Sequence, residues 1–261
     1  MQGLIIFIIC TVVLVFILFI PKSFFKAKVV LPIGFREILF SNVAYYRLLN
    51  DADKIRFEKK IKDFLSYVKI DGVNTKVEPI DKMLIGCSAV IPIFGFENWR
   101  YYNLRYVLLY EGTFDKENFS TTSFERNTLG MVGSGAMQQM MILSKPALRE
   151  GFLNTGEIYN TGIHEFVHLL DKADGSADGV PEQLLSKEQI IIWNKIADKA
   201  IEKIKSGESD INPYGATNKT EFFAVASEYF FQRPDLLKEN HLQLFEMMKE
   251  IFKQTPTVSK K

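Results

Sequence analysis

Hydrophobic residues recur three or four positions apart along much of this chain, a spacing that predicts helices with one buried face. The pattern predicts a helical stretch from Tyr45 to Leu65 and further helices in the C-terminal half. Those later helices are expected over 156–172, 187–205, 218–231 and 235–253. Two short segments, 106–110 and 140–143, are expected to be strands, the first because it is aromatic and β-branched. Strands followed by helices predict an α+β fold.

Two segments between these elements are less defined. Met83–Phe94 is apolar and fits a buried helix or a buried strand, because periodicity does not separate the two in so short a run. The polar stretch 115–139 contains Gly130, Gly133 and Gly135. Their spacing does not fit a dinucleotide-binding loop, so we expect these glycines to lie in turns.

A continuous apolar run opens the chain. From Gly3 to Ile20 every residue except Thr11 is apolar, a length that suits a helix crossing the hydrocarbon core of a bilayer. No basic residue precedes the run and no small-residue cleavage site follows Pro21, so a retained anchor is favoured over a secretory signal peptide.

The residues after this run predict its orientation. Lys22, Lys26 and Lys28 follow it with no acidic residue before Glu37, and the positive-inside rule then places the following domain in the cytoplasm. The alternative is that these lysines form only a solvated linker. The expected organisation is an anchor at 1–21, a linker at 22–35 and one globular domain at 36–261.

Charge and cysteine content exclude two classes of protein. The 32 basic and 31 acidic side chains nearly cancel and form no long basic stripe, which argues against a nucleic-acid partner. Cys10 lies in the apolar run and Cys87 is far from it, so no disulfide framework is indicated.

The segment IHEFVHLLD, residues 163–171, carries the candidate chemistry. On a helix, His164 and His168 lie one turn apart on the same face and can present two imidazoles to one ion. Glu165 is offset by about 100° and can act on a water molecule beside the ion. The alternative interpretation is that His164 and His168 are ordinary core histidines at helical spacing. We expect the helix to begin at a capping box of Asn154 and Glu157 and to stop near Gly175.

A catalytic zinc site needs a third protein ligand, and Asp174 stands where a third histidine of the extended motif would fall. Glu221 and Glu228, on one face of the apolar helix 218–231, are the candidates, and spacing leaves them equal. Asp171 could accept the free N–H of a ligating histidine or be an exposed acid at the helix end. His241 is expected at the surface.

These residues resemble the M90 zinc peptidases, the family of Mlc titration factor A. The resemblance spans roughly residues 45–253. It includes HEFVHLLD (164–171), ADGVP (177–181), Trp193, YGATN (214–218) and EFFAVASEYFF (221–231), with WRYYNLRYVLLYEGTF (99–114) and Asn160 upstream. Lys219 replaces a usual proline and Lys145 stands where a tryptophan is frequent. The anchor is also outside the pattern, since the best-known members are soluble.

The resemblance implies a zincin-like metallopeptidase domain with a small mixed sheet, an active-site helix and C-terminal helices. It implies zinc held by His164, His168 and Glu221, with Glu228 outside the ligand set. The family is also similar to the catalytic domain of anthrax lethal factor, which implies that Tyr214 donates to the transition-state oxyanion. With Glu165 as the base, the expected activity is hydrolysis of a peptide or protein substrate, paired along the edge of strand 140–144.

Two other functions stay open. One is a regulatory binding protein that sequesters a transcriptional repressor, because the family's named member is known for such binding; an intact Glu165 argues against a purely structural zinc site. The other is a membrane scaffold, for which the anchor would be the essential part.

Overall fold

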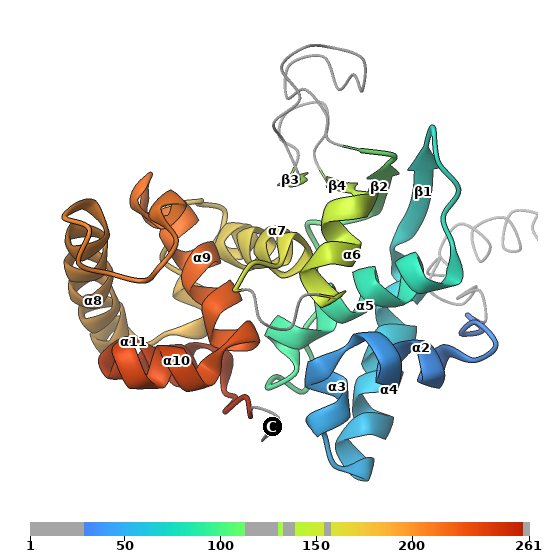
Figure 1. The fold of residues 1–261 in the computed structure, drawn as a ribbon, viewed down its shortest axis with the longest axis horizontal. Coiled ribbons are helices and arrows are strands. Elements are labelled where there is room, and N and C mark those ends of the chain that lie inside the picture. The colour runs from blue at the N-terminus through green and yellow to red at the C-terminus, as the bar shows by residue number, and fades with distance from the viewer. Residues whose placement is uncertain (1–28, 113–129, 133–138, 154–157, 258–261) are drawn as a thin grey trace, which may run out of the picture. The chain divides into compact units, whose positions relative to one another are not determined.

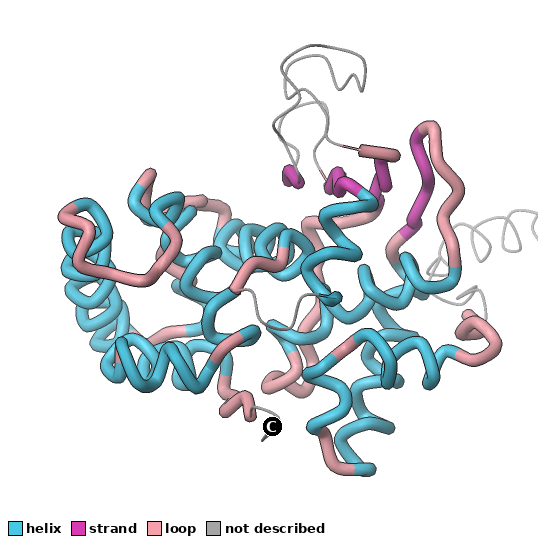
Figure 2. Tube along the Cα trace, viewed as in Figure 1, coloured by secondary structure: helices cyan, strands magenta, loops and turns pink. Residues whose placement is uncertain are grey.

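Helices pack with a small four-stranded sheet in the computed structural model, which describes residues 29–112, 130–132, 139–153 and 158–257 (Figures 1 and 2). The chain divides into the units Met1–Val30 and Leu31–Lys261, and the fold described here is that of the second. Within the described ranges no helix is both long and apolar enough to cross a membrane, and the anchor predicted at 1–21 lies outside them.

The sheet is mixed, with strand order β1-β2-β4-β3. β2 (Tyr106–Tyr110) pairs in parallel with both β1 (Lys69–Val73) and β4 (Met140–Ser144). β3 (Gly130–Val132) is antiparallel to β4 and ends the described sheet. The strands predicted at 106–110 and 140–143 are confirmed, and α+β describes this mixture of helices with a small sheet.

The N-terminal helices are α2 (Phe35–Asn42), α3 (Ala44–Leu48), α4 (Asp51–Tyr67) and α5 (Pro79–Ile93). The single helical stretch predicted from Tyr45 is thus divided, because the Asn50 side chain accepts the backbone N–H of Asp53 and starts α4 afresh. The segment Met83–Phe94, for which the sequence allowed a helix or a strand, is helical as far as Ile93, the end of α5. Asp81 accepts the Glu78 N–H at 2.8 Å and Pro79 occupies the first turn, both typical of a helix start.

The remaining helices are α6 (Lys145–Leu153), α7 (Thr161–Asp171), α8 (Lys187–Lys205), α9 (Lys219–Gln232), α10 (Pro234–Asn240) and α11 (Leu242–Phe252). Short 3₁₀ turns cover Lys172–Asp174, Glu182–Leu184 and Pro213–Ala216. α8 matches its predicted range and α9 differs by one residue at each end. The helix predicted over 235–253 is interrupted at His241.

α7 lies between the sheet and the C-terminal helices and packs against α5, α9 and β3 (Figure 1). Gly162 permits the close approach to α5, because a Cβ there would overlap the Ser88 hydroxyl. One turn further along the helix, the Phe166 ring is 5.5 Å from that of Phe64 and 5.2 Å from that of Tyr101. These contacts fix α7 within the core.

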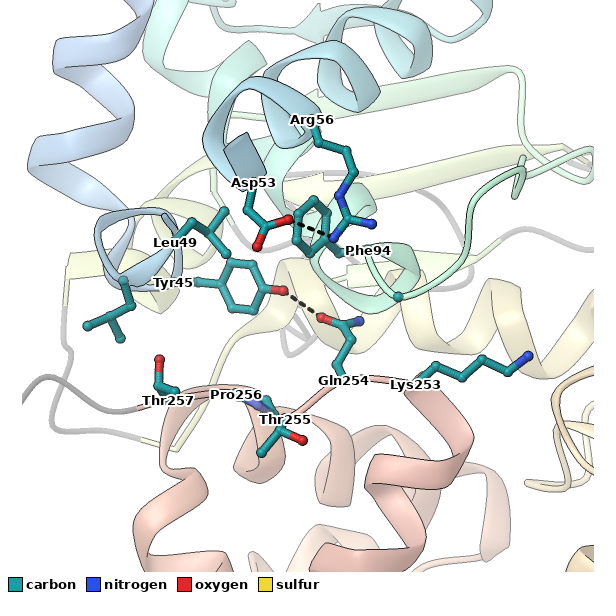
Figure 3. A pocket seen from close by; sticks show the side chains of 12 residues that line it. Tyr45, Leu49, Asp53, Arg56, Phe94, Lys253, Gln254, Thr255, Pro256 and Thr257 are labelled. Carbon is teal, nitrogen blue, oxygen red and sulfur yellow. Dashed lines mark hydrogen bonds and ion pairs between the residues drawn. The ribbon is translucent and has the colours of Figure 1, made fainter. Parts of the chain in front are cut away.

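The C-terminal segment joins α11 to the N-terminal helices (Figure 3). The Gln254 side chain donates to the carbonyls of Ile91 (2.9 Å) and Pro92 (3.3 Å), at the end of α5. Its Oε1 accepts the Tyr45 hydroxyl at 2.5 Å. One glutamine therefore satisfies carbonyl groups that a helix end leaves without backbone partners.

Candidate metal centre

α7 presents both motif histidines from one face. Their ring centroids are 4.6 Å apart and nearly perpendicular. The helix begins at Thr161, where the buried Asn160 side chain caps the N–H of Ile163 at 3.0 Å. α7 therefore begins later than the predicted residue 156, and the capping box predicted from Asn154 and Glu157 lies outside the described residues. Gly175 does close the 3₁₀ turn after α7, with a left-handed φ of 102°.

α9 brings Glu221 to these histidines. Its Oε2 lies 3.1 Å from His164 Nε2 and 3.4 Å from His168 Nε2. One ligand atom from each of the three residues lies within 4.8 Å of the others. The Glu221 N–H is capped by Asn218 at 2.9 Å, so the backbone serves the helix start while the side chain reaches the histidines. The structure thus brings together the three ligands that the resemblance implies.

The charges around this cluster favour a cation. Burial lowers the pKa of His164, but Glu228 and Glu221 outweigh it and raise that pKa to about 10. Burial alone would raise the pKa of the Glu221 carboxyl group. The hydrogen bonds and charges of His164 and His168 outweigh burial, so the pKa of Glu221 lies below its usual range. The carboxylates therefore stabilise positive charge at this position, which a metal ion also supplies. Two imidazoles and one carboxylate are a donor set that suits zinc.

Glu165 lies beside the cluster and is buried, at 5% exposure. Its Oε2 has no hydrogen-bond partner among the described residues, and burial raises the pKa of the carboxyl group. Gly130 of β3 borders this side chain: a Cβ at Gly130 would come within 2.6 Å of Glu165 Oε1. The prediction that Gly130 lies in a turn is wrong, because it is a strand residue that lets β3 approach the carboxylate.

Glu228 holds the other side of His164. Its Oε1 is 2.6 Å from His164 Nδ1, and its Oε2 accepts the Asn160 N–H at 2.5 Å. Glu228 thus joins a histidine of the cluster to the N-cap of α7 and is not in the group of three possible ligands. Spacing did not indicate this pairing, since Asn160 and Glu228 are 68 residues apart.

Asp171 is fully buried and not an exposed acid at the helix end. Its Oδ2 accepts the Gly179 N–H at 3.0 Å, and burial, with further contributions from Asp178 and Asp174, raises its pKa to about 6. Asp171 Oδ1 and His168 Nδ1 both lack hydrogen-bond partners within the described part of the chain. The structure therefore does not show the hydrogen bond suggested for this pair.

Tyr214 approaches from the 3₁₀ turn before α9. Its ring centroid is 6.2 Å from that of His164, and the side chain is 47% exposed. Burial, followed by the charges of Glu221 and Glu165, raises the pKa of its hydroxyl. The phenol therefore remains a hydrogen-bond donor at neutral pH, in contact with the cluster and open to solvent.

Two other expectations are corrected. β4, the strand expected to pair with a substrate, is bonded to β2 on one edge and to β3 on the other, so it has no open edge over Met141–Leu143. His241 is not a free surface residue, because its side chain is 15% exposed and its Nε2 lies 2.5 Å from Asp210 Oδ1. The turn between α10 and α11 holds it there.

Comparison with known proteins supports the family that the sequence resembles. The sequence profile of the glucose-regulated metallo-peptidase M90 family matches residues 24–253. Mlc titration factor A of Pectobacterium atrosepticum is 30% identical over 232 residues, 83% of this chain and 81% of the relative. Mlc titration factor A of Serratia proteamaculans is 31% identical over 166 residues, 58% and 60% of the two chains. An uncharacterized protein of Synechocystis is 26% identical over 239 residues, 88% of this chain and 86% of the relative.

The fold and the cluster are those expected of a metallopeptidase domain, and the chain belongs to the M90 metallopeptidase family. The resemblance inferred from the sequence is thereby confirmed. Membership implies a metal, and the His164, His168 and Glu221 cluster is the group of side chains in the described structure placed to hold one.

Proposed function

We propose that this protein is a zinc-dependent peptidase that hydrolyses peptide bonds with water. The observation that carries the proposal is the convergence of His164, His168 and Glu221, with the buried Glu165 carboxylate beside them. Zinc is the metal proposed because a His₂Glu set with an open position is a recurrent catalytic zinc site. When bound, zinc supplies Lewis acidity, which polarises a carbonyl oxygen and makes nearby water more acidic.

The residues of the chain have separate tasks in this proposal. Glu165 accepts the proton of the attacking water and delivers it to the leaving amine, a role for which its free Oε2 and raised pKa are suited. Tyr214 donates a hydrogen bond to the oxyanion that forms from the substrate carbonyl. Glu228 holds Nδ1 of His164, so that Nε2 faces the cluster.

The proposed path of the substrate follows β3 instead of β4. β3 ends the described sheet, and it packs against α7, the helix that carries the motif. A peptide can pair with such an edge through its backbone, which recognises extended chains with little dependence on side chains.

The test uses the purified full-length chain, with zinc content measured for every variant and turnover measured on a small peptide library. We expect about one zinc per chain, and Glu165→Gln should keep it while losing roughly 10²- to 10⁴-fold in rate. Glu182→Gln, at an exposed position in a 3₁₀ turn, is the matched control. Zinc-loaded Glu165→Gln that cleaves as fast as the wild type contradicts the proposal.

A second pair of variants tests the ligand set. Glu221→Ala removes one of three ligands and should empty the site, whereas Glu228→Ala should still bind zinc at saturating concentration, with affinity lower by roughly 10- to 100-fold. The reverse result would assign the third ligand to Glu228.

A second candidate function comes from the names of the relatives, which are called Mlc titration factor A. By that analogy this chain is a regulatory binding protein that sequesters a transcriptional repressor or other partner, with peptidase activity secondary. A fully zinc-loaded wild type that hydrolyses no member of the peptide library would favour this function.

We also propose a single-pass membrane location, with residues 1–21 as the anchor and the peptidase domain in the cytoplasm. The apolar run from Gly3 to Ile20 and the three lysines after it support this proposal.

A further inference from the structure

A cavity of about 530 Å³ lies between α4 and the loop that follows α5. Four of its lining residues are basic: Arg56, Lys59, Lys60 and Arg100. None of its lining residues belongs to the candidate metal cluster. The volume falls in the range of small-molecule pockets, roughly 300–1,000 Å³. We call it the α4 basic cavity.

The positive charge of this cavity is only partly neutralised. Arg56 pairs with Asp53 at 3.0 Å and Arg100 with Asp63 at 2.6 Å. Neither Lys59 nor Lys60 forms an ion pair with a carboxylate in the part of the chain that the structure describes. Asp63 and Glu97 also line the cavity, so its four basic side chains outnumber the two carboxylates and leave it with an excess of positive charge.

Lys60 is positioned by the protein backbone. Its ammonium donates to the carbonyls of Phe96 at 2.5 Å and Glu97 at 3.0 Å, which leaves one of its three N–H groups for a ligand. Burial, and then the nearby positive charge of Arg56, lower the pKa of Lys60. An anion in the cavity would oppose both effects by stabilising the charged form of Lys60.

Trp99 adds an unused donor. Its indole Nε1 is buried and has no hydrogen-bond partner among the described residues, while the indole of Trp193 donates to the Gly179 carbonyl at 2.7 Å. Burying an N–H without an acceptor is unfavourable and rare in folded proteins. Trp99 lines the α4 basic cavity, so a ligand oxygen there can accept this hydrogen bond.

We propose that the α4 basic cavity binds a small phosphorylated molecule. Its phosphate would contact the Lys59 and Lys60 ammonium groups, and an acceptor atom would reach the Trp99 indole. Phosphate is the group inferred because ammonium groups bind it as point charges, and its several oxygens can serve more than one donor. The aromatic rings of Tyr67, Trp99 and Tyr102, which line the same space, provide a surface for the rest of the molecule.

The test is calorimetric titration of the full-length chain with phenyl phosphate, with benzoate as the carboxylate counterpart. We expect saturable binding of phenyl phosphate, weakened at least roughly tenfold in Lys60→Met by loss of a charged hydrogen bond. Trp99→Phe keeps most of the ring but removes the N–H, and should weaken binding several-fold. Lys62→Met, an exposed lysine on α4 that does not line the cavity, should bind as the wild type does.

Circular dichroism and thermal unfolding check that each variant is folded. Should Lys60→Met be unfolded, Lys59→Met replaces it, because Lys59 is exposed and its loss leaves the core intact. The proposal is overturned if phenyl phosphate does not saturate below about 10 mM. It is equally overturned if benzoate binds as tightly, if folded Lys60→Met or its replacement binds as the wild type does, or if Lys62→Met weakens binding as much.

Discussion

At the residue scale, His164 shows how the centre depends on both nitrogens of an imidazole. Nε2 faces Glu221 and Nδ1 faces Glu228, so the ring is held in one orientation by two carboxylates from α9. The Nε2 of His168 also faces Glu221, but its Nδ1 is without a hydrogen-bond partner in the described structure. The two histidines therefore contribute unequally to the preorganisation of the site.

Tyr214→Phe tests the proposed oxyanion donor. We expect a rate loss on the order of 10²- to 10³-fold, because one hydrogen bond to the developing charge is removed. KM and zinc content should change little, since that bond strengthens mainly in the transition state. Tyr159→Phe is a matched control, because Tyr159 is also 47% exposed. Peptide kinetics in which both variants match the wild type would remove Tyr214 from the mechanism.

Asp171→Asn tests the effect of a buried carboxyl group on stability. The pKa of this group is about 6 in the folded protein and 3.8 for the ordinary side chain, so folding takes up a proton between these values. Its contribution to the free energy of unfolding therefore falls as pH rises from about 4 to 6, by at most about 3 kcal/mol. Above that window the folded protein contains a buried charge that asparagine would remove.

In chelator-treated protein, we expect Asp171→Asn to raise the unfolding temperature at pH 8 and to have much less effect at pH 4. Asp71→Asn, at an exposed position of β1, should show little pH-dependent difference. Unfolding curves in which Asp171→Asn stabilises equally at both pH values would contradict the assignment of the effect to ionisation.

At the element scale, sequence predicted the parts whose signals are local. α8 begins where Ser186 and Gln189 form a capping box, and its predicted range is confirmed. β1 was missed because it is short and mostly exposed, with Asp71 and Gly72 inside it. β3 was missed because its place is defined by pairing with β4 and contact with Glu165, neither of which is visible in local sequence.

The candidate site likewise contains residues that the sequence predicts and contacts that only the packing of the helices defines. The histidine pair and Glu165 were found because they share one helix, and Glu221 was chosen by resemblance. The contacts of Glu228 with His164 and Asn160 depend on how α9 packs on α7, which spacing does not give. Gly130 offered the one available signal, since a glycine within a strand often marks a close approach.

Gln254→Ala tests how the C-terminal segment is attached to the N-terminal helices. The change removes the hydrogen bond that Gln254 donates to the Pro92 carbonyl. It also removes the one that Gln254 accepts from the Tyr45 hydroxyl, which Figure 3 shows. We expect a loss of about 1–3 kcal/mol in the free energy of unfolding, because these groups are part-buried. Urea unfolding of Gln243→Ala, an exposed glutamine of α11, supplies the control and should match the wild type within about 0.5 kcal/mol. Equal losses in both variants would show that the Gln254 contacts contribute nothing specific.

At the scale of the whole molecule, the centre depends on segments that are distant along the chain. His164 and Glu221 are 57 residues apart, and α7 is held between β3, α5 and α9. Loss of packing in the core would therefore separate the ligands without changing any of them. The α4 basic cavity is connected to the same core, because Phe64 lines the cavity and packs on Phe166 of α7.

The last prediction concerns the orientation of the chain at a membrane. Lys22, Lys26 and Lys28 follow the apolar run closely, and basic residues flanking such a run are retained on the cytoplasmic side. We therefore expect the full-length protein to sediment with membranes and its domain to resist protease added to intact cells. The same protease should digest the domain after the cells are opened, which controls for intrinsic resistance.

Changing all three lysines to glutamine should reduce the fraction of protected chains, since it removes the asymmetry that orients the helix. A mature N-terminus near residue 25, or cleavage of the domain in intact cells, would show that the run is a signal peptide or that the orientation is reversed.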